Sequence, residues 1–181
     1  MTISKIYTRN GDQGKTTLFN GCNLSKSDPV FSILAYLDKI SSLIGVCISM
    51  NQSKELKDLI LDWQMIQKKV MAIGSVIAQA ENIRDQVVNK DLGILEEKID
   101  YMMKEAGDLK NLILPGGSIL GAHLHLVRSE TRFLELEYFK LVNKPNNKFI
   151  GPYLNRLSDY FFAAARYVNM VEGGGEIEWK N

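Results

Sequence analysis

The sequence is poor in the residues that mark several classes of protein. It has only 2 cysteines and 4 prolines in 181 residues. Cys22 and Cys47 lack the paired spacing of a zinc site or a disulfide framework. The formal net charge of +1 gives no reason to expect nucleic acid or an anionic membrane as a partner. No segment approaches the roughly 20 apolar residues of a membrane span or the run of a signal peptide. We therefore expect one cytoplasmic domain over residues 1–181.

Hydrophobic residues at helical spacing are abundant instead. Apolar positions recur every three or four residues in five blocks, at about 28–50, 53–80, 91–106, 118–142 and 152–171. Ser27 or Asp28 could cap the first block, with Pro29 at its first helical position. Gly107 is a stop signal after the third. Apart from a short stretch at residues 4–8, no convincing strand alternation is present. The pattern predicts an all-α, five-helix bundle behind a glycine-rich N-terminal loop.

That loop, "RNGDQGKTT" at residues 9–17, looks like half of a nucleotide-binding P-loop. The Walker A pattern requires a glycine where Arg9 stands. A P-loop also follows a hydrophobic strand and is followed by a helix. Neither the strand nor the helix is indicated by the residues around this loop. The loop either binds a triphosphate by another route or is only a glycine-rich turn.

Polar residues interrupt three of the predicted helices. They are Asp38 and Ser41 in the first, Arg128, Arg132 and Glu135 in the fourth, and Asn155, Asp159 and Arg166 in the fifth. The spacing puts the members within each of the last two helices on one face. One interpretation is that these faces are solvated and carry ion pairs within each helix. The other is that they converge on an anionic ligand, to which arginine is well suited.

Two further features are explained by their local structure. His123 and His125 are two residues apart, so on a helix they cannot chelate one metal together, and packed or hydrogen-bonded histidines are expected. "LPGGS" at residues 114–118 starts the fourth helix. It is either a turn alone or a place of close approach to an anion or another group.

Taken together, the motifs resemble those of the PduO-type ATP:cob(I)alamin adenosyltransferases over nearly the whole chain. The matching segments, in order, are T-R-x-G-D-x-G-x-T-x-L at 8–18, L-D-x-I-x-S-x-I-G at 37–45, I-Q-x-x-V-x-x-x-G at 66–74, LEEKID at 95–100, LPGGS at 114–118, H-x-x-R-x-x-x-R-x-x-E at 125–135 and YLNRLSDYFFAAAR at 153–166. Six or more such motifs in the right order are highly specific.

The resemblance implies an ATP site in which the N-terminal loop folds over the triphosphate. The residues it implies are Thr8, Arg9, Asn10, Gly11, Asp12, Gly14, Lys15, Thr16, Thr17, Lys26, Arg132, Glu135 and Asn155. Mg²⁺ would be bound mainly through the ATP phosphates. The loop's glycines allow the close backbone approach that such a site needs.

The resemblance also implies the reaction and the assembly. The 5′-deoxyadenosyl group of ATP would pass to the cobalt of cob(I)alamin, with Arg132, Asp38 and Arg128 as catalytic residues and Asp38, Leu112 and Arg128 at the corrinoid. Asp38, among apolar neighbours and partly buried, would pair with Arg128 across a subunit boundary of a homotrimer. A flavin reductase and an adenosylcobalamin-dependent enzyme would be further partners.

Four positions depart from the family pattern. Tyr36 replaces a glutamate, Ser41 an asparagine, Phe133 the second arginine of a pair, and Leu112 a phenylalanine. In the family that phenylalanine crowds the lower face of the corrin and helps to expel its lower axial ligand. The departures leave open an alternative, a non-catalytic cobalamin or nucleotide carrier on the same fold.

Overall fold

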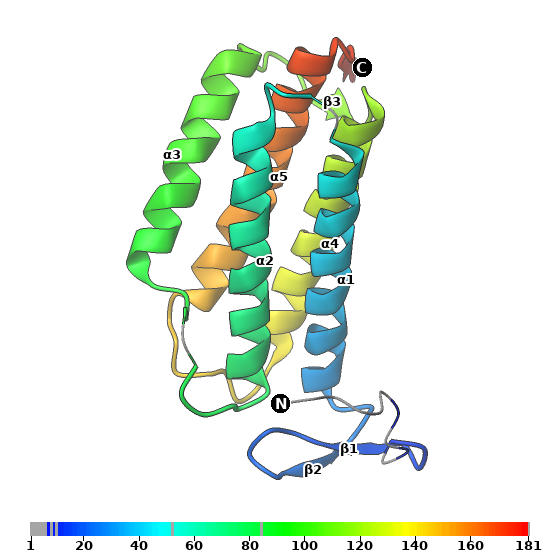
Figure 1. The fold of residues 1–181 in the computed structure, drawn as a ribbon, viewed down its shortest axis with the longest axis vertical. Coiled ribbons are helices and arrows are strands. Elements are labelled where there is room, and N and C mark those ends of the chain that lie inside the picture. The colour runs from blue at the N-terminus through cyan, green and yellow to red at the C-terminus, as the bar shows by residue number, and fades with distance from the viewer. Residues whose placement is uncertain (1–6, 8, 10, 52, 84, 181) are drawn as a thin grey trace.

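The computed structural model of the chain describes residues 7, 9, 11–51, 53–83 and 85–180. Five long helices form most of it (Figure 1). They are α1 (Pro29–Met50), α2 (Lys57–Ile77), α3 (Asn89–Ala106), α4 (Ile119–Lys140) and α5 (Ile150–Glu172). The predicted five-helix fold is confirmed. The largest difference from the predicted bounds is at α2, which begins at Lys57 rather than near Ser53.

The helix ends follow local capping chemistry. The Asp28 side chain accepts a hydrogen bond from the Val30 amide at 3.0 Å, and Pro29 occupies the first helical position of α1. Ser118 caps α4 in the same way. Gly107 ends α3 with a φ of 82°, a left-handed conformation that favours glycine. The predicted start and stop signals at Asp28 and Gly107 are therefore confirmed.

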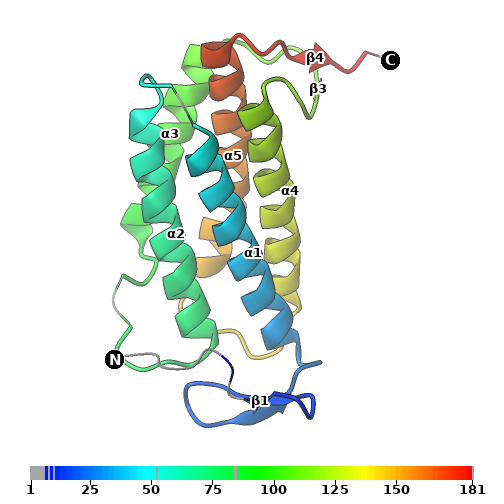
Figure 2. The same cartoon turned by 45° about the vertical axis from the view of Figure 1, so that its right-hand side comes forward.

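The core lies where α5 packs on α3 and α4, while α1 packs on α4 and α2 (Figure 2). Ala163, Ala164 and Ala165 of α5 are completely buried. Because alanine has a small side chain, this row lets the neighbouring helices approach α5 closely. Larger side chains, such as Trp63 of α2 and Phe161 of α5, fill the remaining space.

A small hairpin and a separate two-stranded sheet stand at opposite ends of the bundle (Figure 1). β1 (Lys15–Thr17) pairs with β2 (Asn23–Ser25) near the start of α1, and β3 (Ile113–Leu114) pairs with β4 (Ile177–Glu178) near the start of α4. The expectation that residues 4–8 hold the only strand was therefore wrong, because strands of two or three residues are too short to show alternation. Apart from Tyr7, residues 4–8 lie outside the described residues.

By length and composition alone, α1 could cross a membrane, contrary to the expectation that no segment approaches that character. Only two of its 22 residues, Asp38 and Lys39, carry charge. Both lie in the middle of the helix, where a charge is costly in hydrocarbon. Lys39 forms an ion pair with Glu130 of α4 at 2.7 Å, and one face of α1 is buried in the bundle.

Candidate functional site

The outward face of α4 carries three of the predicted anion-binding residues. Arg132 is exposed, and Arg128 and Glu135 are half-buried. The Glu135 carboxylate accepts a hydrogen bond from Asn155 Nδ2 at 3.0 Å. Asn155 Oδ1 in turn accepts one from Arg156 Nη1 at 2.8 Å. α4 and α5 therefore bring Glu135 and Asn155 together, one turn from the exposed guanidinium of Arg132.

Arg166 does not take part in this arrangement, although it shares a helical face with Asn155. Eleven residues place it about 16 Å further along α5. Its guanidinium is 3% exposed and forms a bidentate ion pair with Glu176, with Nε–Oε1 and Nη2–Oε2 distances of 3.0 and 3.1 Å. It also donates to the Gly107 carbonyl at 3.1 Å. Arg166 thus fixes the C-terminal segment, and the interpretation of Asn155, Asp159 and Arg166 as one polar set was wrong.

The buried His125 and the half-buried Arg128 lie one turn apart on α4. Both ring nitrogens of His125 and Nε of Arg128 are buried without a hydrogen-bond partner among the described residues. Burial, and next the charge of Arg128, lower the pKa of His125 to about 4, so its ring is neutral at pH 7. Burial, and next the charge of Arg132, lower the pKa of Arg128. The ring of His125 packs edge-on against Phe162 at 5.9 Å, as expected of a packed histidine.

The other histidine is hydrogen-bonded within its own helix. His123 Nδ1 lies 2.8 Å from the carbonyl oxygen of Ile119. Among the described residues, no group of three or more His, Cys, Asp or Glu side chains is placed to hold a metal ion. The described part of the chain therefore offers no cage of its own for a cation.

Asp38 lies on the outer surface of α1. Its side chain is exposed, while Leu37 and Ile40 are buried on the other face of the helix. The prediction that apolar neighbours partly bury this carboxylate within the chain is wrong, because those neighbours face α2 and α4. Across the described residues of this one chain, no ion pair joins Asp38 to Arg128.

The glycine-rich loop leads into the β1–β2 hairpin, which brings Lys26 back to it. The Lys26 amide donates to the Gly14 carbonyl at 2.8 Å. A Cβ on Gly11 would stand only 2.7 Å from Lys26 Nζ. Gly14 has a φ of 72°, which a residue with a Cβ adopts only with strain. The loop glycines therefore allow a turn on which the Lys26 ammonium rests.

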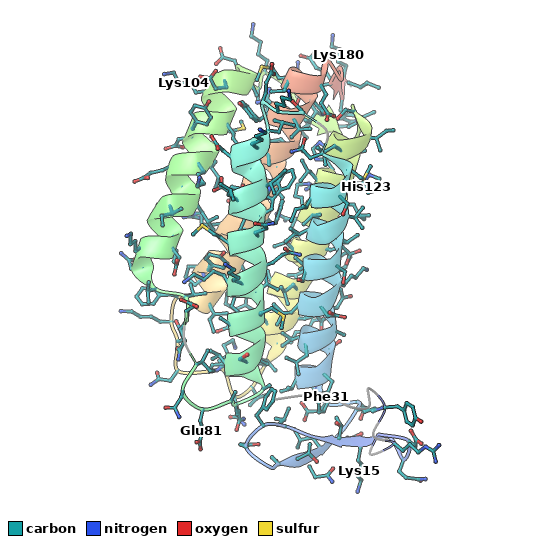
Figure 3. All side chains as sticks on the ribbon, in the orientation of Figure 1. Lys15, Phe31, Glu81, Lys104, His123 and Lys180 are labelled. Carbon is teal, nitrogen blue, oxygen red and sulfur yellow. The ribbon has the colours of Figure 1, made fainter. Side chains whose placement is uncertain are left out.

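The remaining predicted loop residues are spread along the same turn. Arg9, Asp12, Lys15 and Thr17 are exposed and Thr16 is half-buried, and Lys15 projects at the end of the molecule in Figure 3. Thr8 and Asn10 lie outside the described residues. The hairpin is attached to the end of α2 by a hydrogen bond from the Phe19 amide to the Ala78 carbonyl at 3.2 Å.

Two of the departures from the family pattern contact each other. The rings of Tyr36 on α1 and Phe133 on α4 are stacked, with centroids 6.4 Å apart and planes inclined by 10°. The Lys39 ammonium lies 5.8 Å from the centre of the Tyr36 ring. The two positions where the resemblance implies a glutamate and an arginine thus hold two aromatic rings, and these rings join α1 to α4.

The LPGGS loop packs against one side chain of α5, Asn169. Asn169 Oδ1 accepts from the Ser118 amide and Nδ2 donates to the Gly116 carbonyl, each at 3.0 Å. A Cβ on Gly117 or Gly121 would overlap the Asn169 side chain. Of the two readings of this loop, close approach is the one seen, and the group that approaches is an amide of α5.

Leu112 lies directly before β3 of the two-stranded β3–β4 sheet and is 67% exposed. The Trp179 amide donates to its carbonyl at 2.7 Å. Figure 1 places β3 at the end of the bundle opposite the β1–β2 hairpin. The predicted ATP-loop residues and Leu112 therefore lie at opposite ends of α4.

A separate hollow of about 770 Å³ runs along α2 and the loop that follows it. Its lining includes Ser41, Gln67, Met71 and Glu81. Gln67 Nε2 donates to the Ser41 carbonyl at 2.9 Å, which links α1 to α2. None of the predicted ATP or corrinoid residues lines this hollow.

Comparison with known proteins decides which family this arrangement belongs to. The family model described as cobalamin adenosyltransferase matches residues 6–168. The chain belongs to this family. It is 35% identical over 179 residues to the corrinoid adenosyltransferase of Bacillus subtilis, covering 97% of this chain and 92% of that one. It is 33% identical over 188 residues to the corrinoid adenosyltransferase of Homo sapiens, covering 99% and 75%.

Solved structures of the family agree with this fold. A variant of the PduO-type ATP:corrinoid adenosyltransferase of Lactobacillus reuteri, complexed with cobalamin and ATP, superimposes with a TM-score of 0.89. The two proteins are 32% identical, and the match covers 98% of this chain and 100% of that one. The family resemblance drawn from the motifs is confirmed.

The family motifs did not indicate every residue that shapes this site. Asn169 bonds the LPGGS loop, Trp179 bonds Leu112, and Glu176 pairs with Arg166, yet none of the three was predicted from sequence. The one available signal was the glycine at position 121. A glycine in the first turn of a helix indicates that something approaches its backbone closely.

Proposed function

We propose that this chain, as a corrinoid adenosyltransferase, transfers the 5′-deoxyadenosyl group of ATP to the cobalt of cob(I)alamin. Membership of the cobalamin adenosyltransferase family over residues 6–168 carries the proposal. The relatives named above are corrinoid adenosyltransferases, and one of them was solved with both cobalamin and ATP. We treat residues 1–181 as a single domain that acts in the cytoplasm.

The ATP site in this proposal combines the N-terminal loop with the α4–α5 face. Loop amides, the hydroxyls of Thr8, Thr16 and Thr17, and the Lys26 ammonium would bind the phosphates, with Arg9, Asn10, Asp12 and Lys15 beside them. The contact of Lys26 with Gly11 supports this, because it places a cation on the loop backbone. The Glu135–Asn155 hydrogen bond gives the nucleoside side of the site a fixed acceptor and donor. Mg²⁺ would be bound by the ATP phosphates rather than by a set of protein ligands.

The corrinoid site would lie between subunits of a homotrimer, with Asp38 of one chain facing Arg128 of the next. Arg128 supports this because its guanidinium forms no ion pair among the described residues of this chain, and a carboxylate from another chain would give it one. The exposure of Asp38 makes it available to such a neighbour. Leu112 would face the corrin ring.

The outer surface of α4 supports an assembly of this kind. Leu126, Phe133, Leu136 and Phe139 are all exposed, by 43%, 54%, 58% and 55%. Exposed apolar surface of this extent marks a site of protein association. Burial of these side chains between subunits would remove them from water.

The chemistry requires little of the protein beyond position and charge. The cobalt(I) lone pair attacks C5′, the Co–C bond forms, and the C5′–O bond breaks with its electron pair leaving on the triphosphate. No protein base is needed, because no proton is removed from the nucleophile. Arg132 and Lys26 would stabilise the charge that develops on the departing triphosphate. The helices would hold C5′ in line with the cobalt.

A direct assay tests the proposal. Purified protein is mixed with MgATP and chemically reduced cobalamin under anaerobic conditions, and the absorbance change to adenosylcobalamin is followed. Adenosylcobalamin and triphosphate in equal amounts are expected. Binding of both substrates without product would instead identify the chain as a carrier on the same fold.

A further inference from the structure

The β3–β4 sheet places an aromatic side chain directly opposite Leu112. The register pairs Ile113 with Glu178 and Leu114 with Ile177, so the next pair is Leu112 with Trp179. The hydrogen bond from the Trp179 amide to the Leu112 carbonyl, at 2.7 Å, confirms this pairing. Directly opposite residues of antiparallel strands have side chains on the same face, with Cβ atoms about 5 Å apart.

The face of the β3–β4 sheet that carries Leu112 and Trp179 is apolar and open to solvent. Leu112 is 67% exposed and Trp179 50%. Because side chains alternate along a strand, Leu114 and Ile177 lie on the same face, and they are 48% and 66% exposed. A contiguous apolar patch of this kind marks a binding surface.

The patch stands on a fixed support rather than on a loose tail. The segment that carries Trp179 is anchored by the ion pair of Glu176 with the buried Arg166. The Gly174 amide donates to the Asn169 carbonyl at 2.8 Å. A Cβ on Gly174 would overlap the Ser118 amide nitrogen, so the segment lies directly against the start of α4. An indole held in this way loses little further conformational entropy when a ligand packs on it.

We propose that Trp179 is a corrinoid-contacting residue that supplies the aromatic surface missing at position 112. This rests on the proposed function, which places Leu112 at the corrin ring. A phenylalanine at position 112 and a tryptophan at position 179 would occupy the same face of the β3–β4 sheet. The smaller, flexible leucine leaves room for the indole to reach across from the paired strand. The corrin macrocycle is broad and apolar on its faces, and an indole offers a wide, flat surface to pack against it.

The test compares four variants with the unchanged chain. They are Trp179→Ala, Trp179→Phe, the double variant Trp179→Ala with Leu112→Phe, and the control Glu178→Gln. The control changes Glu178, which precedes Trp179 in the chain. Its side chain lies on the opposite face of the β3–β4 sheet. Michaelis constants for corrinoid and ATP are measured separately. Equilibrium binding of cob(II)alamin in the presence of MgATP gives a readout that does not depend on turnover.

Trp179→Ala is expected to raise the Michaelis constant for the corrinoid and weaken cob(II)alamin binding by about tenfold, with the constant for ATP nearly unchanged. Trp179→Phe retains most of the affinity, and Leu112→Phe in the Trp179→Ala background restores it. Glu178→Gln behaves as the unchanged chain.

Two results would overturn the inference while leaving the proposed function intact. One is an active Trp179→Ala enzyme with unchanged corrinoid affinity. The other is a loss caused by dissociation of the oligomer, seen in sedimentation, which would mean that a second copy of the chain covers this face. If the unchanged chain forms no adenosylcobalamin at all, the proposed function fails instead.

Discussion

Adding a single methyl group at Gly121 should destabilise the protein through Asn169. The Cβ of Gly121→Ala would overlap the Asn169 side chain, which is 2% exposed and has no room to shift. Asn169 must then give up its hydrogen bonds to Ser118 and Gly116. Losing two such bonds and leaving a buried partner unsatisfied costs about 3 kcal/mol of unfolding free energy.

The same methyl group should have the opposite effect once Asn169 is shortened. In an Asn169→Ala background the overlap is removed, and Gly121→Ala should stabilise by up to about 1 kcal/mol, since alanine favours the helix. Gly93→Ala is the matched control. Gly93 also lies within a helix, α3, and a Cβ there meets nothing within 4 Å, so stabilisation of about 0.5–1 kcal/mol is expected.

Urea unfolding measures all three effects. One fixed protein concentration is used, because the stability of any protein that self-associates depends on concentration. The reasoning predicts a change of sign between the two backgrounds. If Gly121→Ala costs the same free energy with and without the Asn169 side chain, the contact between them is not what requires glycine.

Three other outcomes are expected. Arg132→Ala should lower turnover more than tenfold while the protein stays folded, since loss of a donor to developing charge costs about 2–4 kcal/mol. Lys140→Ala removes an exposed cation on the same helix and should leave steady-state rates unchanged. Equal rates in both variants would remove Arg132 from the mechanism. Asp38→Asn should raise the Michaelis constant for cobalamin more than that for ATP, with sedimentation showing whether the oligomeric state changes. Unchanged values for both constants would contradict the proposed intersubunit pair. The folded-state pKa of His125, about 4 against an ordinary 6.5, means that the unfolded chain binds the extra proton first, so stability is lost as the pH falls from 6.5 towards 4. Relative to His125→Phe, the unchanged chain should lose about 2 kcal/mol of unfolding free energy between pH 7 and pH 5, and parallel pH curves in chemical unfolding would contradict this.

Helix positions were predictable because each depends on a few neighbouring residues. Hydrophobic spacing located all five, and Asp28 marked the start of α1 through its own side chain. The start of α2 was placed too early because the residues before it form a turn. Asn51 Nδ2 donates to the Leu56 carbonyl and Ser53 Oγ accepts from the Glu55 amide. Such side-chain bonds compete with the helix for backbone groups.

Contacts between distant segments left no local signal. Asn169 and Ser118 are 51 residues apart, so neither suggests the other. Tyr36 and Phe133 were noted separately as departures, and only the fold shows that they stack. Asn155, Asp159 and Arg166 were wrongly grouped because helical spacing gives the side of α5 on which a residue lies. It does not give the neighbouring segment that the residue contacts at its level along the helix.

The stack of Tyr36 on Phe133 has a consequence for the conditions in which the bundle holds together. An ion pair at this place would weaken as ionic strength rises and would be lost when its carboxylate is protonated in acid. Two uncharged rings respond to neither change near neutral pH. The aromatic contact between α1 and α4 should therefore be as stable in concentrated salt as in dilute buffer. The nearby Lys39–Glu130 ion pair is then the contact between these helices that high salt or acid would weaken.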